Sequence, residues 1–211
     1  MTPLMINLAE RSAVIIGGGK VACKRAETLI DHGAKVTIIS PDIIEGLQAL
    51  YQRNEIQWEN KKFEPDDIQG AFIAVIATND LTENQRITAA AENVPLLNRA
   101  DGGEGGNLHF PAHFTRGKLT IAVSTGGASP MLASHLKRNL EVHFPPDYEH
   151  YIDFLYECRQ LLKRSGFSRE VKQDILEKIL EDSYQDPAIQ RQMLEEIEKA
   201  GEEKEFDRIK R

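Results

Sequence analysis

The chain is poor in cysteine and has no long apolar stretch. It carries two cysteines, Cys23 and Cys158, among 211 residues, and they form neither a metal-like nor a redox-like pair in sequence. We therefore expect reduced thiols and a cytosolic (cytoplasmic) protein. The longest uncharged apolar stretch, residues 71–77, is far too short to span a bilayer. The first five residues lack the basic-then-apolar order of a signal peptide, so we expect no membrane partner.

Basic residues are also scarce relative to acidic ones. Against 33 aspartates and glutamates stand 26 lysines and arginines, which gives a net charge of −7. This argues against a general nucleic-acid binder, because neutralising phosphates needs a basic surface. Hydrophobic residues make up 41% of the chain, which favours a substantial core over disorder. The length suits one domain of ordinary size with a smaller appendage.

Residues 12–100 alternate between short apolar runs and helical patterns. The runs at 14–16, 36–39, 72–76 and 95–97 are typical of strands buried on both faces. Between the first two runs, five apolar residues fall on one helical face: Val21, Ala22, Ala26, Leu29 and Ile30. Gly33 follows them as a helix stop. Strand and helix in repeated alternation predict an α/β fold with a doubly wound parallel sheet.

A glycine-rich motif lies between the first run and the first helix. Its sequence, Gly17-Gly18-Gly19-Lys20-Val21-Ala22, fits G-x-G-x-x-(G/A) and indicates a Rossmann-type dinucleotide site. In such a site Gly17 permits the tight turn, Gly19 lets a pyrophosphate approach the backbone, and Ala22 keeps the helix close to the sheet. The helix start at Lys20 and Val21 offers N–H groups and a positive dipole end to phosphates. The alternative is a merely tight strand–helix turn.

The end of the second run should meet the adenosine ribose, and there the chain reads Ser40-Pro41-Asp42. Asp42 lies 20 residues past Ala22, about where an acidic ribose partner is expected. Pro41 displaces it from the usual strand-end position, so Ser40 or a backbone group is the alternative partner. No arginine lies here to hold a 2′-phosphate, which favours NAD over NADP.

The end of the third run carries Thr78 and Asn79, followed by Asp80. In open α/β sheets, ligands bind outside the carboxyl ends of the strands, at the switch point. Thr78 and Asn79 are therefore candidates to line the nicotinamide side of the site. The alternative is that this segment simply caps the next helix, and the two roles are compatible.

The remaining chain predicts two further regions. Residues 119–123 predict a strand, and 130–143 predict a helix whose N-cap is Ser129. Beyond 148 the pattern is helical throughout, with Asp186 as the N-cap of a last helix. We expect a nucleotide-binding domain at 1–112, a mixed α/β dimerisation region at 113–147 and a helical domain at 148–211.

The chain resembles the precorrin-2 dehydrogenase family, including the N-terminal part of bifunctional siroheme synthases. The resemblance covers about residues 4–145 and rests on segments that follow one another in order: 14–22 with Lys24 and Arg25, 33–37, 77–80, 98–101, 110–112 and 124–130. It implies oxidation of precorrin-2 to sirohydrochlorin with NAD⁺ as hydride acceptor. It also implies a homodimer built largely by the middle region.

By the same resemblance, Asp101 matches the family's acid/base aspartate. Two features depart from the family pattern: Arg99 stands where a small aliphatic residue is usual, and the glycine-rich loop 102–106 is longer or looser. The chemistry itself needs a base beside the hydride acceptor, and a partly desolvated carboxylate can serve. The alternative for Asp101 is a turn residue before Gly102.

A substrate with many carboxylates favours a locally positive pocket. Residues 99–138 hold five lysines and arginines but only two carboxylates. Five residues of this region are candidates to bind the substrate: Arg99, His109, Arg116, Ser124 and Lys137.

Bifunctional relatives also insert Fe²⁺ into sirohydrochlorin, and Asp101, His109 and His113 are the residues that could hold a metal for this step. No compact cluster with structural-metal spacing is present, so we expect no metal site and dehydrogenation alone, with a separate chelatase. Two rivals remain, an oxidoreductase acting on another small acid and a non-catalytic NAD(H)-binding module. A methyltransferase would need a further large domain for which 211 residues leave no room.

Overall fold

The structure, a computed structural model, describes residues 1–203. The chain divides into two compact units, Met1–Phe110 and a second that begins at Pro111. No helix in the described part of the chain is both long enough and apolar enough to cross a membrane.

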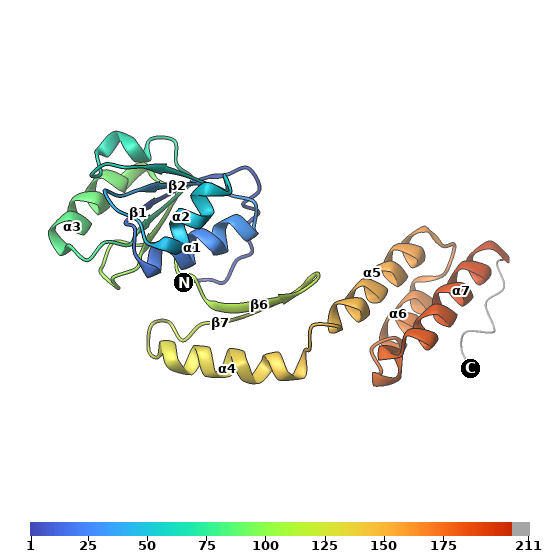
Figure 1. The fold of residues 1–211 in the computed structure, drawn as a ribbon. Coiled ribbons are helices and arrows are strands. Elements are labelled where there is room, and N and C mark those ends of the chain that lie inside the picture. The colour runs from blue at the N-terminus through green and yellow to red at the C-terminus, as the bar shows by residue number, and fades with distance from the viewer. Residues whose placement is uncertain (204–211) are drawn as a thin grey trace. The chain divides into compact units, whose positions relative to one another are not determined.

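Unit 1 is built on a five-stranded, wholly parallel sheet (Figure 1). Its strands are β1 (Ser12–Ile16), β2 (Lys35–Ile39), β3 (Ile56–Glu59), β4 (Ile73–Ile76) and β5 (Leu96–Arg99). They lie in the order β3-β2-β1-β4-β5. The predicted doubly wound sheet is confirmed, and its switch point lies between β1 and β4, where the strand order reverses.

Helices cover both faces of this sheet, which is why its strands are apolar on both sides. Helices α1 (Lys20–Asp31) and α2 (Glu45–Gln52) pack on one face, where Leu29 and Leu47 join Ile15 in the core. Helix α3 (Leu81–Ala90) packs on the other, where Ile87 joins Ile16. Two short 3₁₀ helices, η1 (Pro65–Ile68) and η2 (Ala91–Asn93), complete the unit.

The sequence prediction was wrong for one residue of α1 and missed two elements. Val21 does not join the buried face of α1 but is 47% exposed, and Cys23 packs inward instead. Strand β3 and helix α2 were not predicted. Only Ile56 of β3 is buried, because the strand lies at the edge of the sheet, so it lacks the continuous apolar run of a central strand.

Unit 2 begins with an antiparallel hairpin of β6 (Ala112–Arg116) and β7 (Leu119–Val123), which turns at Gly117 with a φ of +54°. Helix α4 (Pro130–His143) packs against both strands. The Ser129 hydroxyl caps α4 by accepting from the backbone N–H of Leu132 at 3.1 Å, which confirms the predicted N-cap. The predicted strand and helix are confirmed, whereas β6 was missed.

The rest of unit 2 consists of helices α5 (Tyr148–Arg164), α6 (Arg169–Lys178) and α7 (Pro187–Glu203), with the 3₁₀ helix η3 (Asp182–Gln185). They share a core that includes Phe154, Cys158 and Ile197. The Asp186 carboxylate accepts from the N–H of Ala188 at 2.7 Å, as expected of an N-cap. The predicted domain boundaries at 112 and 147 stay predictions, and the end of the expected helical domain, 204–211, lies outside the described residues.

Candidate functional site

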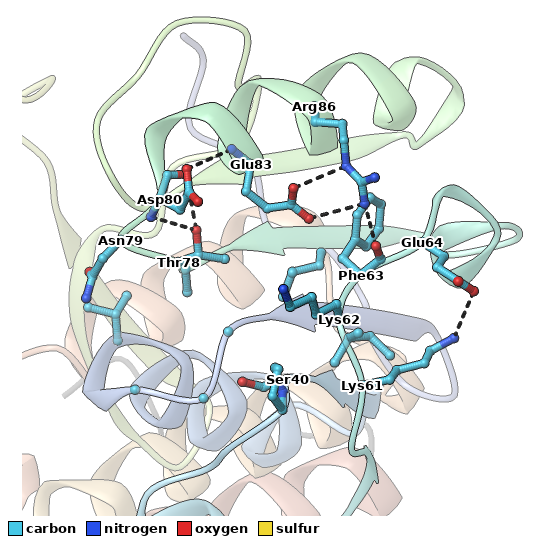
Figure 2. Close-up of a pocket in the computed structure, with 18 of the residues that line it drawn as sticks. Ser40, Lys61, Lys62, Phe63, Glu64, Thr78, Asn79, Asp80, Glu83 and Arg86 are labelled. Carbon is cyan, nitrogen blue, oxygen red and sulfur yellow. Dashed lines mark hydrogen bonds and ion pairs between the residues drawn. The ribbon is translucent and has the colours of Figure 1, made fainter.

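A cleft of about 910 Å³ lies at the carboxyl edge of the sheet, over the switch point (Figure 2). The ends of β1, β2 and β4 and the loop after β3 all contribute to it. Eight of the predicted site residues line it: Gly17, Gly19, Lys20, Val21, Ser40, Pro41, Thr78 and Asn79. Ala22 and Asp42 are not part of this lining.

The glycine loop is shaped by close approaches of the backbone. Gly17 adopts a φ of +124°, and a Cβ there would overlap the carbonyl of Ala77. A Cβ on Gly18 would overlap the carbonyl of Asp42. Gly19 differs, because a Cβ on it would meet no heavy atom within 4 Å. Gly17 therefore makes the turn. At Gly19, the position that the side chain of any other residue would occupy is open space.

The N-terminus of α1 is free to bind an anion. Its N-cap is Gly19, no side chain caps it, and no acidic residue lies in its first turn. The first N–H groups of a helix have no partner within the helix, and they carry the positive end of its dipole. Ala22 is fully buried and holds α1 close to the sheet. Open space at Gly19, next to a helix N-terminus that no side chain caps, fits the diphosphate of a dinucleotide.

The segment after β2 crosses the end of the cleft where the adenosine is expected. The Ser40 hydroxyl donates to the carbonyl of Asp42 at 2.7 Å, and the Ser40 carbonyl accepts from the indole N–H of Trp58 at 2.9 Å. Ser40 and Pro41 line the cleft and Asp42 does not, as expected if Pro41 displaces the acidic residue. The side chain that meets the ribose stays a prediction.

The segment after β4 serves two structural purposes. The Asp80 carboxylate accepts from the N–H groups of Thr82 and Glu83 at 2.9 and 3.1 Å, and so caps α3. Thr78 and Asn79 line the cleft. Figure 2 shows Thr78, Asn79 and Asp80 together at one end of the cleft. Capping and cleft lining, the two readings of this segment, are therefore both compatible with the geometry.

A buried asparagine that the sequence reasoning missed connects this segment to Asp101. The Thr78 hydroxyl donates to Asn84 Oδ1 at 2.5 Å, and Asn84 Nδ2 donates to Asp101 Oδ2 at 3.0 Å. Asn84 is fully buried on α3. The sequence does contain a sign of this role. Asn84 lies three residues before the core residue Ile87, and this spacing places its amide on the inner face of the helix. Asp101 is thus tied to the wall of the cleft.

Asp101 is also held by Arg99 and by the backbone of Gly103. Arg99 Nε and Nη2 donate to the two carboxylate oxygens at 3.1 and 2.6 Å, and the Gly103 N–H donates to Oδ1 at 3.1 Å. The two side chains are only 10% and 13% exposed. The Arg99 guanidinium holds the pKa of Asp101 well below its usual range, which outweighs the opposite effect of burial, and Gly103 and Asn84 lower the pKa further.

The predicted substrate-binding residues are mostly engaged within their own units. Arg99 pairs with Asp101, and its third nitrogen donates to the carbonyl of Glu104. Arg116 donates to the carbonyl of Phe144 at 2.8 Å, and Lys137 pairs with Glu141 at 2.9 Å. The Ser124 hydroxyl accepts from the N–H of Gly126, and His109 is exposed. Their substrate roles stay predictions.

Sequence reasoning missed three cations of the cleft, Lys61, Lys62 and Arg86. Two of the three come from the loop after β3, a strand that was not predicted. Lys61 lies within 4 Å of the carboxylates of Glu59, Glu64 and Asp67. Arg86 pairs with Glu83 at 3.2 Å. Within residues 1–203, no three His, Cys, Asp or Glu side chains gather in a way that could hold a metal ion.

Three family models match successive parts of the chain. A model described as NAD(P)-binding matches residues 4–112, which is more than half of the chain. A model for the central part of a sirohaem biosynthesis protein matches residues 116–143, and the SirC C-terminal domain matches residues 148–193.

Two relatives named precorrin-2 dehydrogenase cover most of the chain. The precorrin-2 dehydrogenase of Priestia megaterium is 34% identical over 200 residues, which is 94% of this chain and 99% of that protein. The enzyme of the same name from Bacillus subtilis (strain 168) is 34% identical over 160 residues, 76% of this chain and 99% of that protein. The solved structure of SirC, precorrin-2 dehydrogenase, is 33% identical with a TM-score of 0.80, and the match covers 94% of this chain and 100% of that one.

We predict that Gly19→Ala weakens NADH binding at least about tenfold while the protein stays folded. The added methyl group meets no protein atom and so enters the space that a diphosphate would occupy. Loss of stability should be about 1 kcal/mol or less, because Gly19 is an N-cap. NADH fluorescence titration and thermal melting measure the two effects.

The matched control is Gly166→Ala, which also adds a methyl group in open space but in unit 2. It should leave NADH binding unchanged. Equal affinities for wild type and Gly19→Ala would show that the diphosphate does not rest on this loop.

Proposed function

The chain belongs to the precorrin-2 dehydrogenase family and is an NAD-dependent oxidoreductase, and from this we propose how its own residues carry out the oxidation of precorrin-2 to sirohydrochlorin. The observation that carries the proposal is the open face of Gly19 beside the uncapped start of α1, at the switch point of the sheet. Nothing in the loop blocks the approach of a diphosphate there, and the peptide dipoles of α1 favour one.

When bound, NAD⁺ supplies the hydride acceptor. The residues of the chain hold this cofactor in position. Gly17 sets the turn, and Lys20 and Val21 line the region of the diphosphate. Thr78 and Asn79 line the opposite end of the cleft. Binding both reactants against this edge removes most of the entropic barrier to their encounter.

Asp101 is our candidate for the base that takes the proton accompanying the hydride. Its carboxylate is ionised near neutral pH, and Asn84 and Gly103 fix its orientation. A carboxylate with so low a pKa is a weak base while Arg99 holds it. We infer that a carboxylate of the substrate competes for Arg99, which raises the pKa of Asp101 and frees an oxygen to accept the proton. This gives Arg99 and Asp101 linked roles.

Unit 2 supports a homodimer. A two-stranded hairpin is marginally stable alone and needs an apolar face covered. Here α4 covers part of it, yet none of the five residues of β7 is buried. Helix α4 also leaves apolar side chains exposed, with Met131 at 83%, Leu132 at 48% and Leu136 at 40%. We infer that the same elements of a second copy cover these side chains, because a two-fold interface pairs a patch with itself.

Both cysteines are free and buried, which fits a reducing compartment, and we propose the cytoplasm as the location. We also propose that the chain dehydrogenates and leaves metal insertion to a separate chelatase.

The direct test is an anaerobic reaction of precorrin-2 with NAD⁺, followed at once by NADH absorbance and by the sirohydrochlorin spectrum. We expect both signals to rise together with one NADH for each macrocycle. Binding of NADH without any spectral change would favour the non-catalytic module. Adding Co²⁺ to preformed sirohydrochlorin should give only the uncatalysed rate of insertion, and faster insertion would establish the bifunctional alternative.

We predict that Asp101→Asn lowers kcat by about 10²- to 10⁴-fold, the usual contribution of a positioned base. NADH affinity should stay within about twofold, because Asp101 does not line the cleft. The amide preserves the shape of the side chain, so a similar melting temperature would show that the fold is intact. Full activity of this variant would remove Asp101 from the reaction.

Arg99→Met tests the link between the two residues through pH. Removing the guanidinium raises the pKa of Asp101 toward its ordinary range. A base works only when deprotonated, so activity is lost as pH falls through its pKa. The acid limb of the kcat/KM profile should therefore move to higher pH in this variant. An unchanged acid limb would contradict the linked roles.

We predict that Leu132→Asp converts the protein from a dimer into a monomer in light-scattering measurements at micromolar concentration. A carboxylate in the centre of an apolar interface is left without a partner. Leu81→Asp is the matched control, because Leu81 is 67% exposed on α3 of unit 1. That variant should remain dimeric, and a monomeric wild type would rule out the homodimer.

A further inference from the structure

Among residues 1–203, Lys62 is a cation of the nucleotide cleft with no counterion. Of the four cations that line the cleft, Lys61 and Arg86 are in ion pairs. Lys62 is exposed and, within residues 1–203, has neither a hydrogen bond nor an ion pair. The nearby carboxylates of Glu59, Glu64 and Asp67 are turned to Lys61. Lys62 is thus available to an anionic ligand.

Hydrogen bonds between the ends of two strands place Lys62 at the adenosine end. Ile39 of β2 lies beside Glu59 of β3, and the N–H of Ser40 donates to the carbonyl of Glu59 at 3.2 Å. The segment after β3 therefore starts next to Ser40. Lys62 follows three residues later and lines the same cleft as Ser40 (Figure 2). In Rossmann-type sites the end of β2 meets the adenosine ribose.

The carboxylate that would exclude a phosphate from this ribose is displaced. NAD-selective sites use an acidic residue at the end of β2, which binds the ribose hydroxyls and repels a 2′-phosphate. Ser40 and Pro41 occupy that position here, and Asp42 is not part of the cleft lining. The Ser40 hydroxyl is a neutral group that can donate or accept.

We propose that this end of the cleft binds a 2′-phosphate, with Lys62 as its cation, so that the enzyme accepts NADP⁺ as well as NAD⁺. The inference rests on the proposed function only in requiring a dinucleotide in the cleft. The phosphate gains a charge-assisted contact with Lys62, which is unpaired in its absence. NAD⁺ makes no use of this charge, so Lys62 should contribute selectively to one cofactor.

The only tryptophan of the chain gives a reporter at the right place. Trp58 lies on β3, and its indole N–H donates to the carbonyl of Ser40. Its fluorescence can follow titrations with adenosine 2′,5′-bisphosphate and with 5′-AMP, which differ only in the 2′-phosphate. NADPH and NADH are compared in the same way, without any turnover.

For the wild type we expect the dissociation constant of NADPH to lie within about tenfold of that of NADH. Lys62→Ala should raise the constant for NADPH about tenfold and that for NADH less than about threefold. Lys62→Arg should restore NADPH binding, because it restores the charge. Lys20→Ala is the contrast: Lys20 is the first residue of α1, beside the diphosphate region, so its loss should weaken both cofactors alike.

The outcomes separate the two proposals. NADH binding with NADPH more than about 100-fold weaker would overturn the 2′-phosphate site and leave the dehydrogenase assignment standing. Equal weakening of both cofactors by Lys62→Ala would place Lys62 at the diphosphate and also overturn it. Failure of either dinucleotide to bind would overturn the nucleotide site itself. Melting curves of each variant check that it is folded.

Discussion

Parallel pairing of β1 with both β2 and β4 brings three strand ends to one edge of the sheet, and the chain must then turn into α1 within that confined space. The carbonyl groups of Ala77 and Asp42 press on the loop from two sides, so that Gly17 and Gly18 cannot carry a Cβ without overlap. Because glycines fill the turn, α1 begins without a side-chain cap. Its unpaired N–H groups are thus a consequence of strand pairing, and they are what a diphosphate needs.

The same edge fixes the electrostatic state of Asp101. Asn84 reaches it from α3, and Arg99 reaches it from the end of β5. A carboxylate with four hydrogen-bond donors is well placed but reluctant to accept a proton. The hydrogen bonds that fix the position of this carboxylate therefore also lower its basicity. We infer that a substrate rich in carboxylates resolves this conflict, because it offers Arg99 another partner.

Local patterns were enough to predict the fold and much of the cleft. The glycine motif, the Ser129 and Asp186 caps and the buried central strands each depend on residues close in sequence. What could not be predicted depends on the shapes of loops and on contacts between distant segments. Arg99 was assigned to the substrate, yet its nearest carboxylate is two residues away in a loop whose shape no local rule gives. Lys62 was missed because its position follows from the pairing of an edge strand.

A count of charges along the sequence likewise does not show which cations lack an ion-pair partner. The segment 99–138 has an excess of positive charge, but Arg99, Lys118 and Lys137 are each paired with a carboxylate, and the partner of Lys118 is Asp153, outside the segment. Lys62, in contrast, lies in a segment with an excess of negative charge, since residues 55–67 hold five carboxylates and two lysines. Three of these carboxylates lie within 4 Å of Lys61, whereas Lys62 has no ion pair within residues 1–203. An anionic ligand is attracted most strongly to a cation that has no ion-pair partner within the protein. Which cation that is depends on contacts that form only when the chain folds.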